Sequence, residues 1–194
     1  VTVAGEANHA GSTAMADRKD ALVAAAGFIN KVPEIVKEYG NEFTVATVGT
    51  IKVTPHSVNV IPGTCTFSLE IRDQSAEVMK LIENHLRQLL EDICKKYGVT
   101  STFVPTSYHD PAPMSELVRG TIEEAVKELG IDYTVIPSGA FHDSLIMTSV
   151  FPTGMIFVPS KDGISHSRYE YTAPEDIENG CNVLLNTVLK LDEK

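Results

Sequence analysis

The residue best placed for chemistry in this chain is His166, which lies in a polar loop that contains a glycine. The loop follows the apolar stretch Pro152–Pro159, which predicts a buried strand. Such a strand and loop deliver side chains to the active site in many α/β enzymes. His166 is therefore a candidate metal ligand. A tetrahedral zinc site needs further ligands, and no H-x-x-x-H pair, cysteine pair or acidic cluster elsewhere in the sequence clearly completes it.

Three polar residues in the first part of the chain could bind a ligand. His9 lies in a loop of small residues, where a ligand can approach the backbone, although a loop histidine is often merely exposed. Asn59 lies in a turn before a strand. Its side chain could bind a ligand, or it could form a hydrogen bond with its own backbone. Arg72 ends a strand on its polar face. Its guanidinium could hold a carboxylate through two hydrogen bonds, or form a surface pair with Glu70 or Asp73.

The stretch 138–143 is a fourth candidate. Gly139 and Ala140 lie where backbone amides would be exposed. His142 and Asp143 are adjacent, so they could orient a ligand or simply satisfy each other in a turn. They do not indicate a nucleophilic triad, because the neighbouring Ser144 lies in no nucleophile-elbow sequence.

Composition excludes several classes of protein. The chain has 194 residues, of which 43% are hydrophobic, as in ordinary globular proteins. Its net charge of −10, with no basic cluster, argues against nucleic-acid binding. No apolar run approaches the roughly 20 residues that span a membrane, so we expect no membrane association. The three cysteines lack metal-site spacing and fit reduced thiols in the cytoplasm.

Strands and helices must alternate to position these residues in the first part. The periodicity predicts strands over 1–3, 43–53, 64–72 and 100–104, with helices over 21–39 and 75–97. This β-α-β-β-α-β order predicts an α+β domain in which two helices cover one face of an antiparallel sheet, the ferredoxin-like arrangement.

The composition changes at residues 109–113, where two prolines mark a boundary. Beyond it we expect a helix from Ser115, strands over 133–136 and 152–159, and a last helix that starts at a capping box over Thr172–Glu175. About 85 residues are few for an independent α/β domain. Because the sequence also starts with Val1 as if within a strand, we expect a piece of a longer polypeptide.

Four motifs carry a resemblance to a known family. They are Gly5 to Ala21 with its Asn-His-Ala-Gly core, Asn59 to Gly63 with Arg72 thirteen positions after Asn59, Ser138 to Asp143, and Gly163 to Ser167. In this order they resemble the N-carbamoyl-L-amino acid hydrolase and allantoate amidohydrolase group of dinuclear-metal amidohydrolases. The resemblance covers essentially the whole chain but only the back half of the family pattern.

The resemblance implies two domains. Residues 1–108 would be the ferredoxin-like lid and dimerisation domain. Residues 109–194 would be the C-terminal part of an α/β metallopeptidase-like catalytic domain. The upstream part, which in the family supplies most metal ligands and the catalytic glutamate pair, has no counterpart in this sequence.

The resemblance also implies roles in the lid. His9 matches a catalytic histidine that reaches the site of a neighbouring subunit and stabilises the oxyanion. Asn59 and Arg72 match the pair that grips the substrate carboxylate. The lid would also form the homodimer.

In the catalytic part, the resemblance makes His166 the last metal-binding histidine. Gly139 and Ala140 would line the substrate pocket, with His142 beside them. The implied cofactor is a pair of divalent metal ions per active site of the full-length protein, zinc, manganese, cobalt or nickel, which this chain alone would not retain.

The implied activity is hydrolysis of the C–N bond of N-carbamoyl-L-amino acids or of ureido acids such as allantoate, small substrates that bear a carboxylate. Two alternatives stay open: the chain as it stands is a non-catalytic dimerisation and ligand-binding module, or its parent is a dipeptidase or aminoacylase of the same superfamily. Phe141 replaces a common glycine, and Ala14 and Arg168 replace common prolines. These departures leave the choice of substrate open.

Overall fold

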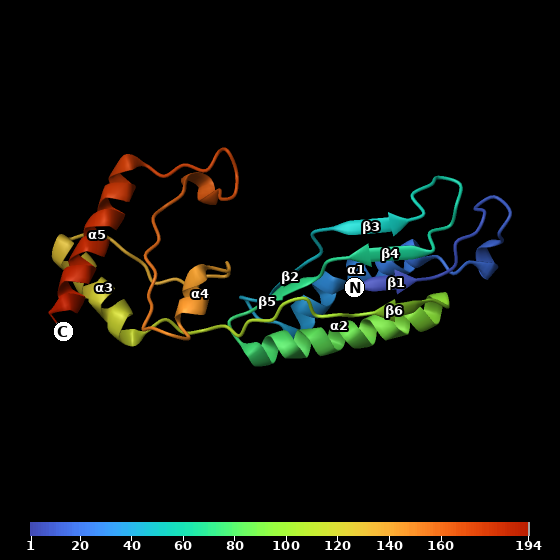
Figure 1. The fold of residues 1–194 in the computed structure, drawn as a ribbon, viewed down its shortest axis with the longest axis horizontal. Helices are drawn as coiled ribbons and strands as arrows, with labels where there is room; N and C mark the ends of the chain where they lie inside the picture. The colour runs from blue at the N-terminus through green and yellow to red at the C-terminus, as the bar shows by residue number, and fades with distance from the viewer. Residues whose placement is uncertain (194) are drawn as a thin grey trace. The chain divides into compact units, whose positions relative to one another are not determined.

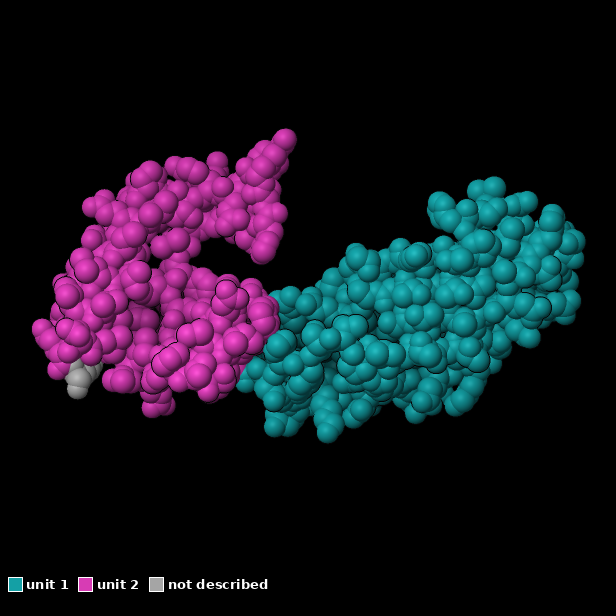
Figure 2. Space-filling model, in the orientation of Figure 1, with its two compact units in different colours: residues 1–111 teal, residues 112–194 magenta. Residues whose placement is uncertain are grey.

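The computed structural model describes residues 1–193, which have a mixed α/β fold and form two compact units (Figures 1 and 2). Unit 1 comprises Val1–Pro111, and unit 2 begins at Ala112. No helix within residues 1–193 is long and apolar enough to cross a membrane.

The two long helices of unit 1 begin and end at residues suited to helix termini. Helix α1 spans Ala21–Tyr39, and the Asp20 carboxylate caps it by accepting hydrogen bonds from the amides of Leu22 and Val23. Helix α2 spans Ala76–Tyr97, with Ser75 as N-cap and a left-handed Gly98 as C-cap. Both helices were predicted from the sequence.

The main sheet of unit 1 has four antiparallel strands in the order β3-β4-β1-β6. These strands are β1 (Thr2–Ala4), β3 (Ile51–Thr54), β4 (Thr64–Phe67) and β6 (Thr100–Thr102). A separate two-stranded sheet pairs β2 (Val45–Thr47) with β5 (Glu70–Arg72). A short 3-10 helix, η1 (Met15–Asp17), precedes α1.

The core of unit 1 lies between one face of the main sheet and the two helices. Val3, Cys65 and Phe67 alternate inward, because successive side chains of a strand point to opposite faces. They pack with apolar residues of both helices in one cluster, and the rings of Phe67 and Phe28 lie 5.6 Å apart. Burial of this continuous apolar surface is the main stabilising term for unit 1.

Two predicted strands of unit 1 are each divided in two, which corrects the sequence-based prediction. The stretch 43–53 breaks between β2 and β3, and the stretch 64–72 breaks between β4 and β5. At the break, the Ser68 hydroxyl accepts hydrogen bonds from the amides of Gly49 (3.2 Å) and Thr50 (3.0 Å). A side chain thus replaces the acceptor that a continuous ladder would provide.

Unit 2 is built mainly from helices. Helices α3 (Glu116–Leu129) and α5 (Pro174–Asp192) pack against each other, and the short elements α4 (Asp143–Met147) and η2 (Lys161–Gly163) lie between them in sequence. The buried side chains of the two long helices are few: Thr121, Ala125, Val126, Val183 and Thr187.

Two further predictions for unit 2 are wrong. Residues 133–136 and 152–159 form no strand, and within residues 1–193 neither stretch has a partner strand. Several of their apolar side chains are exposed, including Val135, Ile136 and Phe157. The Thr172 capping box is also absent, because α5 begins at Pro174 with Ala173 as N-cap and no side-chain cap. The last helix itself was predicted, and it has Pro174 in its first turn, where proline is well tolerated.

Candidate functional site

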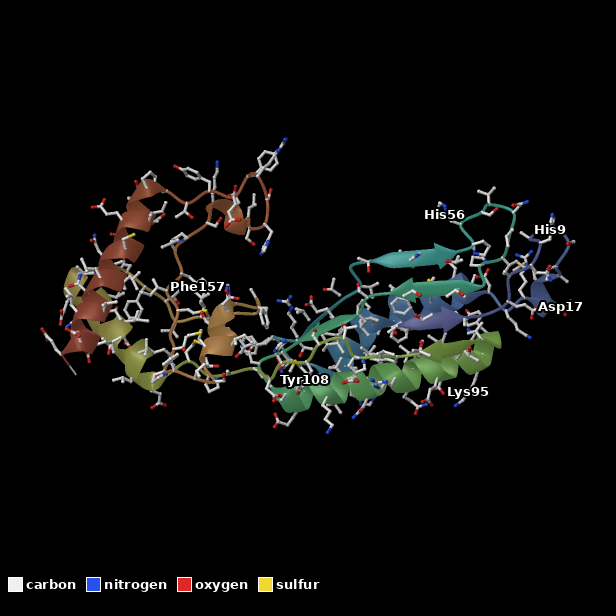
Figure 3. All side chains as sticks on the ribbon, viewed as in Figure 1. His9, Asp17, His56, Lys95, Tyr108 and Phe157 are labelled. Carbon is white, nitrogen blue, oxygen red and sulfur yellow. The ribbon has the colours of Figure 1, made fainter. Side chains whose placement is uncertain are left out.

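The loops that carry His9 and Asn59 lie side by side at one end of unit 1, where Figure 3 labels His9 and His56. The amide of Ala10 donates to the carbonyl oxygen of Asn59 (2.9 Å), and the amide of Ile61 donates to that of Asn8 (2.8 Å). An isolated antiparallel bridge joins His9 to Val60. The structure therefore brings together two of the predicted site residues that are 50 positions apart in the sequence.

A close backbone approach holds the start of the His9 loop. The amide of Gly5 donates to the carbonyl oxygen of Gly63 (2.8 Å), and the amide of Glu6 donates to that of Lys19 (2.8 Å). A Cβ atom on residue 5 would lie 1.9 Å from the Lys19 oxygen. Only glycine fits here, which explains the first glycine of the motif.

His9 is exposed, and its own loop fixes its ring. The amide of Gly11 donates a hydrogen bond to Nδ1 of the imidazole (3.0 Å), while the His9 amide donates to the Asn8 side chain (2.8 Å). The His9 carbonyl accepts from the amides of Ser12 and Thr13 and from the Thr13 hydroxyl. The loop 8–13 is thus a tight turn in which His9 makes several contacts.

Asn59 is exposed, and its amide has a defined orientation. The Ser57 hydroxyl donates to the Asn59 side-chain oxygen at 2.7 Å. The side-chain NH₂ group is the part of Asn59 that can then donate to an acceptor such as a carboxylate. This arrangement suits the substrate-binding role predicted for Asn59.

Arg72 lies at the other end of unit 1, at the end of β5 (Figure 1). The chain from the start of β4 to the end of β5 has an extended length on the order of 25 Å, at about 3.3 Å per residue. The Arg72 guanidinium donates to the Glu70 carboxylate at 2.7 Å, and the Arg72 side chain is 36% exposed. Within one chain the structure does not bring Arg72 together with His9 and Asn59.

The second predicted pocket segment, residues 138–143, is organised by a serine. The Ser138 hydroxyl contacts Nε2 of His142 (3.1 Å) and accepts from the amide of Ala140 (3.3 Å). The His142 ring lies 5.5 Å from the ring of Phe157. His142 is half-buried, whereas Gly139 and Ala140 are exposed.

His166 is exposed and has a left-handed backbone conformation with φ of 54°. Few residues other than glycine adopt this conformation, and those that do are enriched in Asn, Asp and His. Its amide donates to the Glu170 carboxylate at 2.9 Å, which holds the loop at this angle.

The residues present do not fit a dinuclear metal centre by themselves. Among residues 1–193, no group of three or more His, Cys, Asp or Glu side chains could hold a metal ion. A dinuclear site needs several protein ligands, and His166 supplies one candidate.

Four residues have supporting roles that the sequence-based reasoning did not assign to them: Gly11, Arg18, Ser57 and Ser138. Ser57 and Ser138 carry a local signal, because each lies two to four positions before the polar residue that it orients. Gly11 contacts the His9 ring, and Arg18 donates to the carbonyl oxygens of Ala10 and Thr13. These contacts depend on how the loop turns, which no periodicity reveals.

A family model described as peptidase family M20/M25/M40 matches residues 1–190. An N-carbamoyl-L-amino acid amidohydrolase of Geobacillus stearothermophilus is 40% identical over 190 residues, which are 98% of this chain and 46% of that protein. An allantoate amidohydrolase of Bacillus subtilis (strain 168) is 35% identical over 191 residues, with coverage of 98% and 46%.

A solved structure with a similar fold points to the same group of proteins. The crystal structure of an amidase of the hydantoinase/carbamoylase family from Burkholderia vietnamiensis matches with a TM-score of 0.92 and 34% identity. The match covers 97% of this chain and 46% of that one. The chain thus spans about half the length of the relatives that it matches.

Proposed function

Because the chain belongs to peptidase family M20/M25/M40, we propose that it is the C-terminal part of a metal-dependent amidohydrolase that hydrolyses N-carbamoyl-L-amino acids or related ureido acids. The reaction would add one water molecule to the carbamoyl group and release an amino acid, ammonia and carbon dioxide. Relatives named for N-carbamoyl-amino acids and for allantoate support this substrate class.

The observation that carries the proposal is the junction of the His9 and Asn59 loops. It gathers an imidazole and a carboxamide at one exposed end of unit 1. In the proposed reaction, His9 donates a hydrogen bond to the oxyanion that forms on the attacked carbonyl. Asn59 donates to the substrate carboxylate through its NH₂ group, and Arg72 pairs with that carboxylate electrostatically.

Unit 1 is proposed to be the ferredoxin-like lid and dimerisation domain, residues 1–108. The strand order β3-β4-β1-β6 and the position of both helices against the core face of this sheet support that proposal. Unit 2 is proposed to be the C-terminal portion of the catalytic domain, residues 109–194. The predicted strands 133–136 and 152–159 that have no partner strand within residues 1–193 are consistent with an incomplete sheet.

A homodimer is proposed because the gripping residues lie at opposite ends of unit 1. One small substrate is far shorter than the extended chain length of roughly 25 Å between the start of β4 and Arg72. A single substrate can contact both Asn59 and Arg72 if two copies of the lid contribute to one site. His9 would then serve the site of the neighbouring subunit, with Asn59 beside it.

The full-length protein is proposed to use two divalent metal ions per active site, zinc, manganese, cobalt or nickel. His166 would be one ligand, and the other ligands would lie in the part of the protein outside this chain. Gly139, Ala140 and His142 would line the pocket for the substrate. We also propose a cytoplasmic location, which the three free thiols support.

The decisive experiment measures ammonia release by the full-length protein. We expect N-carbamoyl-L-amino acids, allantoate or ureidoglycolate to be hydrolysed with a kcat/KM at least about a hundredfold above that for dipeptides and N-acetyl amino acids, a difference of roughly 2.7 kcal/mol in transition-state stabilisation. Exclusive cleavage of dipeptides or N-acyl amino acids would instead support the dipeptidase or aminoacylase alternative.

The alternative of a non-catalytic binding module concerns the chain as it stands. It is favoured by the lack of a metal-binding group among residues 1–193. We expect the 194-residue chain to hydrolyse none of these substrates and to hold well under one divalent metal ion per chain. Elemental analysis that finds two metal ions per chain would refute this expectation.

A further inference from the structure

We propose that Gly11 and Arg18 are positioning residues for His9, which together keep the ring proton on Nε2 and fix the direction of this donor. The catalytic meaning of this arrangement rests on the proposed function, whereas the arrangement itself is a property of the loop 8–18. It depends on three features of that loop: the Gly11 amide as a donor, the lack of a side chain at Gly11, and the hydrogen bonds of the Arg18 guanidinium.

The backbone donor determines which nitrogen of His9 carries the proton. The Gly11 amide donates to Nδ1 at 3.0 Å. A peptide amide has one proton and cannot accept, so Nδ1 must present its lone pair. In the neutral imidazole the proton then resides on Nε2. The ring therefore offers a donor, and not an acceptor, at its far nitrogen.

The missing side chain at position 11 leaves room for the ring. A Cβ atom on this residue would lie 3.1 Å from Cε1 and 3.4 Å from Nδ1 of His9. The first distance is shorter than ordinary van der Waals contact, so the imidazole would have to shift by a few tenths of an ångström. Any such shift acts directly on the Nδ1 hydrogen bond, because the same ring edge makes both contacts.

The guanidinium of Arg18 holds the turn by hydrogen bonds to two of its carbonyl oxygens. Its Nη2 donates to the carbonyl oxygens of Ala10 (2.6 Å) and Thr13 (3.1 Å), and its Nε also donates to Thr13 (3.2 Å). The Thr13 hydroxyl in turn donates to the His9 carbonyl at 2.8 Å. The half-buried Arg18 guanidinium thus joins the carbonyl groups of Ala10 and Thr13, which flank Gly11, and limits how far Gly11 can move.

The position of the ring proton decides whether Nε2 of His9 attracts or repels the oxyanion of the proposed reaction. A developing oxyanion is stabilised by a donor that is already oriented, since no reorganisation is then needed during the reaction. With the proton on Nδ1, the ring would present a lone pair toward the anion instead. Gly11 and Arg18 therefore act on the reaction through His9 without contact with the substrate.

Nuclear magnetic resonance of the 194-residue chain labelled with ¹⁵N tests the arrangement directly. In the neutral form of His9 we expect the ring proton on Nε2 and a scalar coupling across the hydrogen bond between the Gly11 amide nitrogen and Nδ1. Gly11→Ala and Arg18→Gln should each weaken or abolish that coupling and increase the Nδ1-protonated form. His56, in the neighbouring loop, serves as the reference histidine in the same spectra.

Arg87→Gln is the matched control. Arg87 is also a half-buried arginine of unit 1 that donates to a backbone carbonyl, that of Phe103 (3.3 Å), but it lies on α2. Its loss should leave the His9 signals unchanged. A neutral wild-type His9 with its ring proton on Nδ1, or a coupling that survives both Gly11→Ala and Arg18→Gln, would overturn the proposal.

Kinetics of the full-length protein separate this proposal from the proposed function. Gly11→Ala should lower kcat about tenfold, with KM within about twofold, since a small misplacement of a catalytic group acts on the chemical step. If the coupling is present but no ureide is hydrolysed, the proposed function fails and the positioning stands. If ureides are hydrolysed but the coupling is absent, the positioning fails and the function stands.

Discussion

The amide of Ala10 donates a hydrogen bond of 2.9 Å to the carbonyl oxygen of Asn59, so the loop that carries His9 is attached to the backbone of the other candidate residue at this end of unit 1. The two side chains share one rigid junction. Their separation in space is therefore set by main-chain contacts and is insensitive to most surface substitutions nearby.

Two substitutions of His9 in the full-length protein distinguish its nitrogens. The amide nitrogen of Gln can occupy the place of Nε2 as a donor, whereas Asn can accept from Gly11 in the place of Nδ1 but reaches no further. We expect His9→Asn to lower kcat by about 10²- to 10³-fold and His9→Gln to lower it less. Steady-state kinetics check this order, and an equal or reversed loss would contradict the donor role of Nε2.

Arg72→Ala in the full-length protein should raise KM for substrates with a carboxylate by about tenfold or more, because a charge-assisted pair is lost. The KM of Arg72→Lys should lie between those of the wild type and Arg72→Ala, since lysine keeps the charge but not the planar guanidinium. An unchanged KM for Arg72→Ala would show that this side chain does not bind the carboxylate.

Glu70→Gln is the companion variant for Arg72. The Glu70 carboxylate now pairs with this guanidinium at 2.7 Å and competes with a substrate for it. We expect KM for the same substrates to fall or stay constant. A large rise in KM would mean that Glu70 orients Arg72 and does not compete for it.

Asp20→Ala should lower the free energy of unfolding of unit 1 by about 1 kcal/mol, because α1 loses the acceptor for its first amides. Urea unfolding followed by far-UV circular dichroism measures the change. Asp17→Ala removes an exposed carboxylate three positions earlier and should cost less than about 0.5 kcal/mol. Equal effects of the two substitutions would refute the capping role.

Burial raises the pKa of the Cys65 thiol, and the nearby Asp20 charge adds to the effect. The folded chain thus keeps this proton to a higher pH than the unfolded chain. The resulting stabilisation is complete below the ordinary thiol pKa, and it is lost as the pH rises through the raised pKa. Above that ordinary value, stability should fall less steeply with pH in Cys65→Ala than in the wild type.

The exposed Cys181 provides the control for this pH series. Cys181→Ala should leave the alkaline slope of the free energy of unfolding unchanged, since the Cys181 side chain is exposed in the folded chain. All other residues are the same in the three proteins, so their effects cancel in the comparison. A Cys65→Ala slope equal to that of the wild type would contradict the effect of burial.

Local signals predicted the helices of unit 1 well. The apolar periodicity lies within each helix, and the caps Asp20, Ser75 and Gly98 act within one turn of the helix that they terminate, so no distant contact is needed to place these ends. The break in the strands was not predicted because it depends on Ser68, whose hydroxyl reaches Gly49 and Thr50 across the fold. The alternation of apolar and polar residues shows which side chains share a face of the sheet, but it does not reveal such a contact.

The candidate site shows the same limit. The resemblance named His9, Asn59 and Arg72 together, but spacing could not show that the first two adjoin and the third lies at the far end of unit 1. In unit 2, apolar runs at 133–136 and 152–159 read as strands, although a strand also needs a neighbour that the sequence pattern does not contain.

The unequal burial of the two units has a thermodynamic consequence. Fourteen buried apolar residues form one cluster in unit 1, whereas Leu184, Leu185, Val188 and Leu189 of α5 are more than half exposed. Cooperativity follows from the apolar surface removed from water. Heating the chain should therefore melt unit 1 in a sharp transition and unit 2 in a broad, shallow one, so that calorimetry records two enthalpies and no single Tm.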